Sequence, residues 1–162
     1  MNLYMKQKVF SWGDKFTVFD EESQPKYLVK GEVFSLGKKL HIYDTAENQL
    51  GFIHQKLLAL MPRYFFEQNG TQVAEVNKKI ALFRQKYIIT PQGWEVDGNF
   101  FEHDYTISAN GQNIATIKKE WFTFGDAYHI NISDDVDELT VLAVVLIIDA
   151  CNESNNTSSA NN

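Results

Sequence analysis

The feature that most constrains this chain is an apolar run near its C-terminus. From Leu139 to Ile148 every residue except Thr140 is aliphatic, and Asp149 follows. A helix that is apolar on every side has to be surrounded by protein or by lipid. The surroundings of this run therefore decide which kind of molecule the chain forms.

The length and the flanks of the run favour burial in protein over a membrane span. A helix over residues 136–151 would be about 24 Å long at ~1.5 Å per residue, whereas a span needs about 20 consecutive apolar residues. Acidic residues precede the run, in place of the Lys, Arg, Trp or Tyr that anchor a spanning helix. We predict no transmembrane span and a helix enclosed by the rest of the chain.

The residues before the run predict short antiparallel strands. Aromatic or branched side chains alternate with polar ones in segments that end at turn residues. Asn69-Gly70 and Asn110-Gly111 are the strongest hairpin signals, because a tight type I′ turn needs positive φ at both central positions. The clearest alternating segments are 16–20, 40–44, 105–107 and 128–132.

Part of this strand pattern occurs twice. The residues around Asn69-Gly70, from Tyr64 onward, recur 41 positions later around Asn110-Gly111. The matched positions after the turn are Phe83 with Phe124, Tyr87 with Tyr128 and Ile89 with Ile130. Turn chemistry alone explains the Asn-Gly pairs but not these distant matches, so we interpret the pattern as a duplicated hairpin with a third strand.

Repeated hairpins with an apolar inner face can close into a barrel, which removes exposed sheet edges. A barrel of many strands is too wide for its own side chains to fill. We therefore predict a mainly β fold of the α+β class, in which a closed antiparallel barrel surrounds the helix at about 136–151. The predicted domain covers residues 1–152, and the polar residues 153–162 are predicted to form a disordered tail.

Composition limits the classes of function. With 162 residues, of which 44% are hydrophobic, the chain suits one domain. A net charge of -6 argues against a general nucleic-acid or anionic-membrane surface, although a local basic patch is compatible with it. Cys151 is the sole cysteine, and no signal-like segment opens the sequence. These features predict a cytoplasmic location, no cofactor and no structural zinc.

An acidic cluster precedes the apolar run. Asp135 is the predicted N-cap, with Glu138 as its capping-box partner, and Asp134 and Asp137 add negative charge at the positive end of the helix dipole. The alternative is a calcium site formed by Asp134, Asp135 and Asp137, since hard cations bind carboxylate oxygens. The spacing and central glycine of an EF-hand are absent from this segment.

Asp149 requires a partner because its carboxylate lies toward the negative end of a buried helix. We predict that a lysine near the barrel mouth reaches it, either Lys78 or its repeat mate Lys119.

The residues quoted above, taken with several short motifs, resemble the LURP-one-related (YxjI-like) family. That family lies within the Tubby C-terminal-like superfamily, which includes phospholipid scramblases. The motifs are residues 6–11, 16–20, 31–40, 53–56 and 126–130, followed by the helix that ends in Ile148-Asp149. The resemblance implies a barrel of twelve strands around a central C-terminal helix. It also implies binding of phosphoinositide headgroups through basic residues, as in Tubby relatives, and places Asp134, Asp135 and Asp137 where scramblases carry a calcium-responsive acidic segment.

Basic residues near the ends of the predicted strands are the main functional candidates. Lysine pairs at such positions commonly protect strand edges, but convergence on one rim would create a site for a phosphate headgroup. The candidates are Lys38, Lys39, Lys78, Lys79, Lys118, Lys119, Arg63 and Arg84.

No catalytic constellation is visible in the sequence. His41, His54, His103 and His129 are predicted to lie singly on separate strands, and His103-Asp104 neighbours in a strand would point to opposite faces. The leading prediction is a non-enzymatic binding or scaffold domain whose partner is an anionic phospholipid headgroup or a protein. The alternatives are a carrier of an apolar ligand in an open lumen and a divergent hydrolase; burial of Val144 and Val145 from all sides would leave no lumen.

Overall fold

Twelve strands precede one helix in the computed structural model, which describes residues 1–6, 15–81, 84–122 and 125–159, without the side chains of 81, 84, 122, 126 and 153–159. The strands are β1 (Asn2–Lys6), β2 (Lys15–Asp20), β3 (Pro25–Gly31), β4 (Lys39–Tyr43), β5 (Gln49–Gln55), β6 (Arg63–Gln68), β7 (Thr71–Ala81), β8 (Arg84–Thr90), β9 (Trp94–Asn99), β10 (Asp104–Ala109), β11 (Gln112–Phe122) and β12 (Gly125–Ile132). The helix is α1 (Glu138–Ser159).

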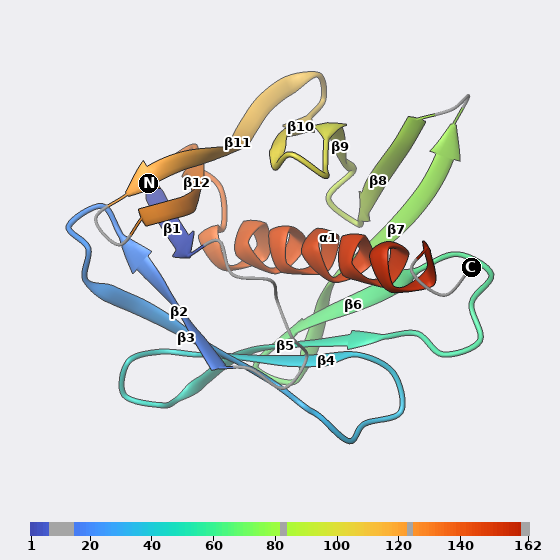
Figure 1. Cartoon of the computed structure of the whole chain (residues 1–162), viewed down its shortest axis with the longest axis horizontal. Coiled ribbons are helices and arrows are strands. Elements are labelled where there is room, and N and C mark those ends of the chain that lie inside the picture. Colours follow the sequence, from blue (N-terminus) through green and yellow to red (C-terminus); the bar gives the residue numbers. More distant parts are fainter. Residues whose placement is uncertain (7–14, 82–83, 123–124, 160–162) are drawn as a thin grey trace.

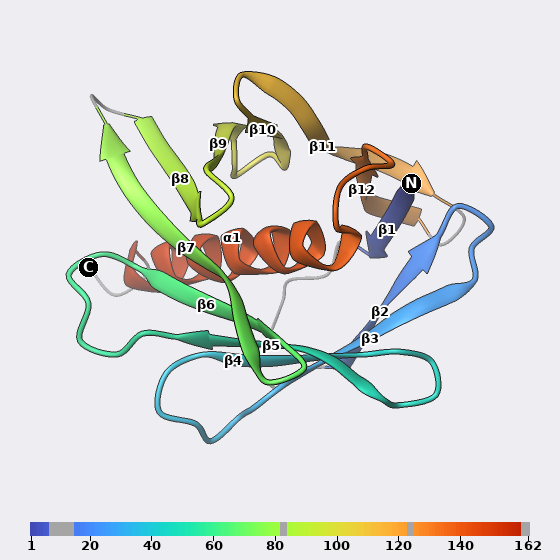
Figure 2. The same cartoon turned by 180° about the vertical axis from the view of Figure 1, so that it is seen from behind.

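The strands form one closed antiparallel barrel (Figures 1 and 2). Each strand pairs with its sequence neighbours, and the barrel closes because β1 pairs with both β2 and β12. Side chains alternate along the strands, so that one set points inward and is buried: Leu3 and Met5 in β1 and Leu40 and Ile42 in β4 are examples. The predicted fold class and the twelve strands are confirmed.

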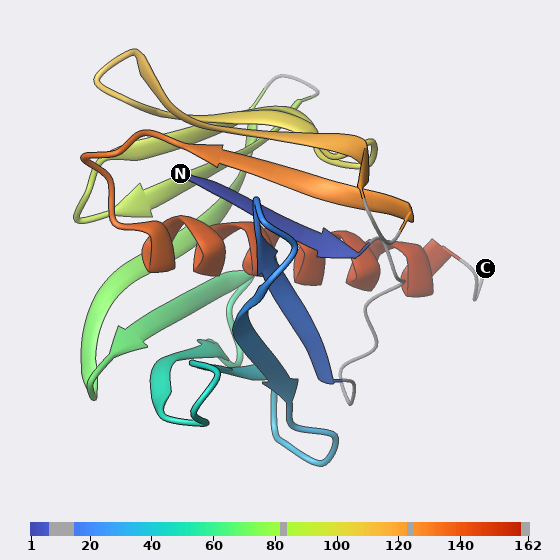
Figure 3. The same ribbon diagram turned by 90° about the vertical axis from the view of Figure 1, so that its left-hand side faces the viewer.

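The helix passes through the barrel (Figure 3), and its buried side chains fill the lumen. Residues 141–148 are each at most 1% exposed, and Val144 and Val145 are fully buried. Inward side chains of the strands join these helix residues in one hydrophobic cluster. The position predicted for the apolar run is therefore confirmed.

The bounds of the helix differ from the sequence expectation at both ends. It begins at Glu138 instead of Val136, and Asp137 instead of Asp135 caps it by accepting hydrogen bonds from the Thr140 backbone N–H, at 2.9 Å, and from the Thr140 hydroxyl. The prediction of Asp135 as N-cap was wrong because the β12–α1 turn extends two residues further than expected.

Glu138 also has a different role from the predicted capping-box partner. Its carboxylate is buried and accepts hydrogen bonds from Lys26, at 2.8 Å, and from the Tyr27 hydroxyl, at 2.6 Å. At the other end the helical backbone continues to Ser159, through most of the segment predicted to be a disordered tail. The residues after Cys151 contain neither Gly nor Pro, and extending an existing helix is easier than starting one.

The sequence repeat corresponds to a structural repeat. β6, β7 and the start of β8 match β10, β11 and the start of β12 with the same 41-residue offset, and so do the β-bulges after Phe66 and Ile107. Both Asn-Gly turns have positive φ, 49° and 74° at Asn69-Gly70 and 50° and 78° at Asn110-Gly111. Phe83, Phe124 and residues 7–11 of the first motif lie outside the described residues.

The path of the chain gives the barrel two unlike ends. At the helix-start end lie the turns β2–β3, β4–β5, β6–β7, β8–β9 and β10–β11 with the start of α1. At the helix-exit end lie the described connections β3–β4, β5–β6 and β9–β10 and the end of α1. Acidic residues gather at the helix-start end: Asp20, Glu21, Glu22, Asp44, Glu47, Asp134, Asp135, Asp137 and Glu138. Over the described residues, no helix is long and apolar enough to cross a membrane.

Burial of the helix predicts a contrast between two identical substitutions. Leu142→Ala, at a fully buried position of α1, should reduce the free energy of unfolding by about 2–5 kcal/mol, because it removes buried methyl groups and leaves a cavity. Leu60→Ala, at a fully exposed loop position, should change it by less than about 0.5 kcal/mol. Urea unfolding followed by circular dichroism measures both; equal losses would contradict the enclosed helix.

Candidate anionic-headgroup site

The helix-exit end contains buried polar contacts to the helix. His103, in the β9–β10 turn, lies 2.7 Å from the Asp149 carboxylate through its Nε2 atom, and both side chains are largely buried. The His103 ring also stacks on Tyr128, with ring centroids 3.9 Å apart and an interplanar angle of 14°. Asp149 therefore has a polar partner, as expected for a buried carboxylate, but the prediction that this partner is a lysine was wrong.

The reason for this difference is a local turn that the sequence did not reveal. We expected His103 in a strand beside Asp104, but it precedes β10 and has a φ of 52°. This left-handed backbone geometry lies in the turn between β9 and β10, and it places the ring against the helix instead of along a strand face. The other three histidines also lie near carboxylates: His41 with Glu32, His54 with Glu67 and His129 with Glu120.

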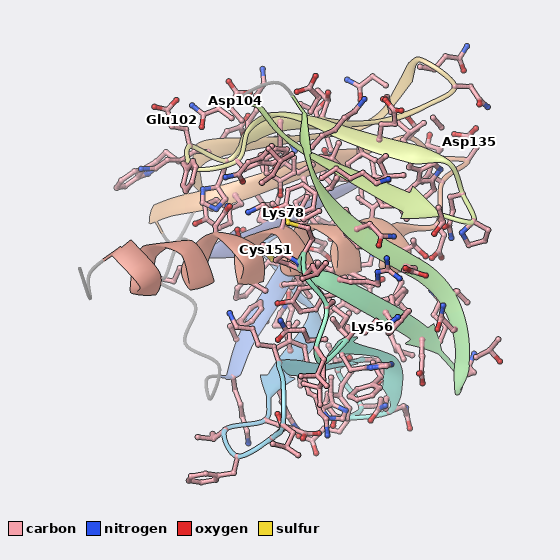
Figure 4. The ribbon with its side chains drawn as sticks, turned by 90° about the vertical axis from the view of Figure 1, so that its right-hand side faces the viewer. Lys56, Lys78, Glu102, Asp104, Asp135 and Cys151 are labelled. Atoms are coloured by element: carbon pink, nitrogen blue, oxygen red, sulfur yellow. The ribbon has the colours of Figure 1, made fainter. Side chains whose placement is uncertain are left out.

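Cys151 is buried two residues beyond Asp149 in the helix. Burial raises the pKa of its thiol to about 11, while the Tyr87 hydroxyl and the charges of Lys78 and Lys38 act in the opposite direction. Figure 4 shows Lys78 next to Cys151 at the helix. Lys38 donates a hydrogen bond to the Ala150 carbonyl oxygen at 2.9 Å. Lys38 and Lys78 thus both approach the last buried part of the helix. The raised pKa keeps the Cys151 thiol protonated at neutral pH.

A pocket at the same end is the strongest candidate for a binding site. It has a volume of about 480 Å³ and lies between the β5–β6 loop and the end of β7. Its lining residues are Lys56, Leu58, Ala59, Leu60, Met61, Pro62, Arg63, Asn77, Lys78, Lys79 and Ile80. Four cationic side chains therefore share one pocket with several apolar ones.

These four cations differ in their surroundings. Lys56 and Lys79 are exposed, whereas Lys78 is only 8% exposed. Arg63 lies 3.2 Å from the Glu75 carboxylate, so part of its charge is already neutralised. Guanidinium and ammonium groups together suit a phosphate oxygen, which accepts charge-assisted hydrogen bonds from both.

The structure brings together only some of the eight predicted basic residues. Arg63, Lys78 and Lys79 line the pocket, and Lys38 contacts the helix nearby. Lys39 pairs with Glu32 at 3.4 Å, and Lys118 and Lys119 lie in β11, four strands away from β7. Arg84 begins β8, and its side chain lies outside the described part of the chain.

Lys56 was missed by the sequence reasoning. It directly follows β5, and only the tertiary path of the β5–β6 loop brings it opposite β7. The available signal was its place in the motif 53–56, but Lys56 has no neighbouring lysine, unlike the lysine pairs that mark the other lysine candidates.

The three calcium candidates do not share a site. Asp134 is 94% exposed and lies 3.2 Å from the N-terminal amino group, while Asp137 caps the helix and accepts a hydrogen bond from Gln68. Within the described residues, His, Cys, Asp and Glu side chains form no group of three that could hold a metal ion.

A closed twelve-stranded antiparallel barrel around a C-terminal helix defines the structural class. The chain belongs to the LURP-one-related family, whose model matches residues 1–149. It is 35% identical over 150 residues, 92% of each chain, to the uncharacterized protein YxjI of Bacillus subtilis (strain 168). Its fold is similar to the X-ray structure of the Arabidopsis thaliana protein AT5G01750, with a TM-score of 0.67 and 16% identity over 93% of this chain and 90% of that one.

The contact between His103 and Asp149 predicts a coupling energy. In a double-mutant cycle, His103→Phe retains a ring against Tyr128 and Asp149→Asn retains the shape of the carboxylate. The pair should show a coupling of about 1–3 kcal/mol in the free energy of unfolding, because it is nearly buried. The His41–Glu32 pair has the same 2.7 Å separation but is more exposed, and should show about 0–1 kcal/mol.

Burial of Cys151 predicts low reactivity. An aromatic disulfide reagent should modify the native thiol at least about 100-fold more slowly at pH 8 than the unfolded chain, because a pKa of about 11 in place of 9.0 reduces the thiolate fraction. Absorbance of the released thiolate measures both rates. Similar rates in the native and the urea-unfolded protein would contradict the buried position.

Proposed function

We propose that this protein is a non-enzymatic, peripheral binding domain for anionic phospholipid headgroups, with the pocket at the helix-exit end as its binding site. The observation that carries the proposal is the gathering of Lys56, Arg63, Lys78 and Lys79 around one pocket of a protein whose net charge is -6. Because the net charge of the protein is negative, an anionic ligand would be attracted only to this local cationic site and not to the protein surface as a whole.

The distribution of acids supports the same proposal. Nine acids lie at the helix-start end, including those of the β2–β3 and β4–β5 turns. Acids also occur at the helix-exit end, namely Glu32, Glu102, Asp104 and Asp149, but no carboxylate or histidine is among the lining residues of the pocket. A membrane with anionic lipids would therefore attract the helix-exit end and repel the opposite end. The cytoplasmic location predicted from the sequence fits this role, because the cytoplasmic leaflet carries most of the anionic lipid.

The two alternative functions have less support. A carrier of an apolar ligand needs an open lumen, and the fully buried Val144 and Val145 occupy it. A hydrolase needs clustered acid and base groups in a cleft, whereas the charged groups that line this pocket are all cations.

A vesicle co-sedimentation experiment tests the proposal. The protein should bind vesicles of phosphatidylcholine and phosphatidylglycerol and not vesicles of phosphatidylcholine alone. The double variant Lys56→Gln/Lys79→Gln should lose about tenfold or more in affinity, since each lysine near an anionic surface contributes about 1 kcal/mol.

The matched control is Lys118→Gln/Lys119→Gln, which removes the same charge from β11, away from the pocket. Its loss should be clearly smaller; an equal loss would show general electrostatic attraction instead of a defined site. A separate measurement compares the melting temperature with and without inorganic phosphate. If phosphate raises the melting temperature of the protein but not of the Lys56→Gln/Lys79→Gln variant, and no vesicles bind, the ligand is free phosphate and not a lipid headgroup.

A further inference from the structure

Exposed apolar side chains gather at the helix-exit end of the barrel. Among the described residues, nine of the ten large hydrophobic side chains that are exposed belong to connections or strand ends on this side, and Met1 is the exception. They are Val33, Phe34, Leu36, Leu57, Leu58, Leu60, Ile80, Phe101 and Trp121. Phe34, Leu58 and Leu60 are fully exposed. Such a one-sided distribution indicates an interaction surface.

Most of these residues lie on two loops that contact each other. We call the segments 32–38, between β3 and β4, and 56–62, between β5 and β6, the apolar loops. The Lys38 carbonyl oxygen accepts a hydrogen bond from the Gln55 backbone N–H at 2.8 Å, and the Lys38 backbone N–H donates to the Gln55 side chain at 3.2 Å. A Cβ atom added at Gly37 would lie 2.8 Å from the Leu57 side chain, so the two loops are in close contact.

The second loop is also tied to β7 and to the basic pocket. The Lys78 backbone N–H donates a hydrogen bond to the Pro62 carbonyl oxygen at 3.1 Å. Leu58 and Leu60 line the pocket together with Ile80. The apolar loops, the end of β7 and the cations therefore form one continuous surface.

We propose that the apolar loops insert Phe34, Leu36, Leu58 and Leu60 into the interfacial region of an anionic bilayer. This inference rests on the proposed headgroup binding and adds the mode of attachment and the orientation of the barrel. Lysines next to the loops supply the charge that complements anionic lipid, whereas aromatic and aliphatic side chains suit the boundary between headgroups and acyl chains.

The combination of apolar and cationic side chains on this surface fits contact with a bilayer better than it fits the core of a protein interface. Its apolar side chains project from two adjacent loops, and the loop 56–62 lines a pocket that contains four cations. The cores of protein interfaces, by contrast, are depleted in charge. The orientation also follows. The end of α1 would lie nearest the membrane, while the acidic helix-start end would point toward water.

Depth-dependent quenching tests the insertion. An environment-sensitive fluorophore is attached to a cysteine introduced by Phe34→Cys or Leu58→Cys; the native Cys151 is buried, and the unsubstituted protein shows how far it reacts. On vesicles of phosphatidylcholine and phosphatidylglycerol, the emission of both labels should shift to shorter wavelength, and lipids that carry a nitroxide on the acyl chain should quench it. The matched control is Gln72→Cys, exposed at the helix-start end, where neither change is expected.

A second pair of variants separates insertion from charge. Leu58→Ser/Leu60→Ser should weaken vesicle binding about tenfold or more, because a leucine that inserts into the bilayer contributes hydrophobic binding energy. This contribution involves no charge, so the salt dependence of binding should stay unchanged. Lys56→Gln/Lys79→Gln should instead reduce the salt dependence. Circular dichroism and thermal melting confirm that each variant is folded.

Each outcome has a defined meaning. Vesicle binding without quenching at positions 34 and 58 overturns the insertion and leaves the headgroup proposal standing. Absence of binding to anionic vesicles overturns both. If the leucine variants change the oligomeric state in sedimentation velocity without lipid, the surface joins two copies of the chain, and the membrane assignment is wrong.

Discussion

The structure depends on one requirement: the lumen of a wide barrel has to be filled. Twelve strands enclose more space than their inward side chains can occupy, and α1 supplies the missing apolar surface. The dependence is mutual, because a helix that is apolar on all sides is stable in water only when it is enclosed. The barrel and residues 141–148 of the helix are therefore stable only together.

Filling the lumen has a consequence for function. Many barrels bind ligands inside, but here Val144 and Val145 occupy that space. Recognition is left to the two ends of the barrel, which the chain path makes chemically different. The acids at the helix-start end complement the positive end of the helix dipole, and lysines such as Lys38 and Lys78 approach its later turns. The same charge separation supports the orientation that we propose for the protein near an anionic surface.

The candidate site is built from local features with separate structural causes. Strand pairing between β6 and β7 positions Arg63 and Lys78, while the β5–β6 loop contributes Lys56 and the exposed leucines. Leu58 and Leu60 do not contribute to the stability of the folded monomer, because their side chains are fully exposed and bury almost no apolar surface. Their exposure beside four cations is the observation that supports our proposal of a binding surface at this end.

The sequence by itself determined the apolar helix and the repeated Asn-Gly hairpins, because periodicity and turn chemistry are local properties. It predicted a closed barrel from the need to enclose that helix and to remove sheet edges, while the number of twelve strands came from the resemblance to the family. It also established that Asp149 needs a partner. Only the tertiary structure decided that this partner is His103, that Asp137 caps the helix and that Lys56 joins Arg63, Lys78 and Lys79. Each of these contacts depends on the path of a turn or loop, and most of them join residues far apart in the chain. The hydrophobic pattern of the sequence does not encode such paths.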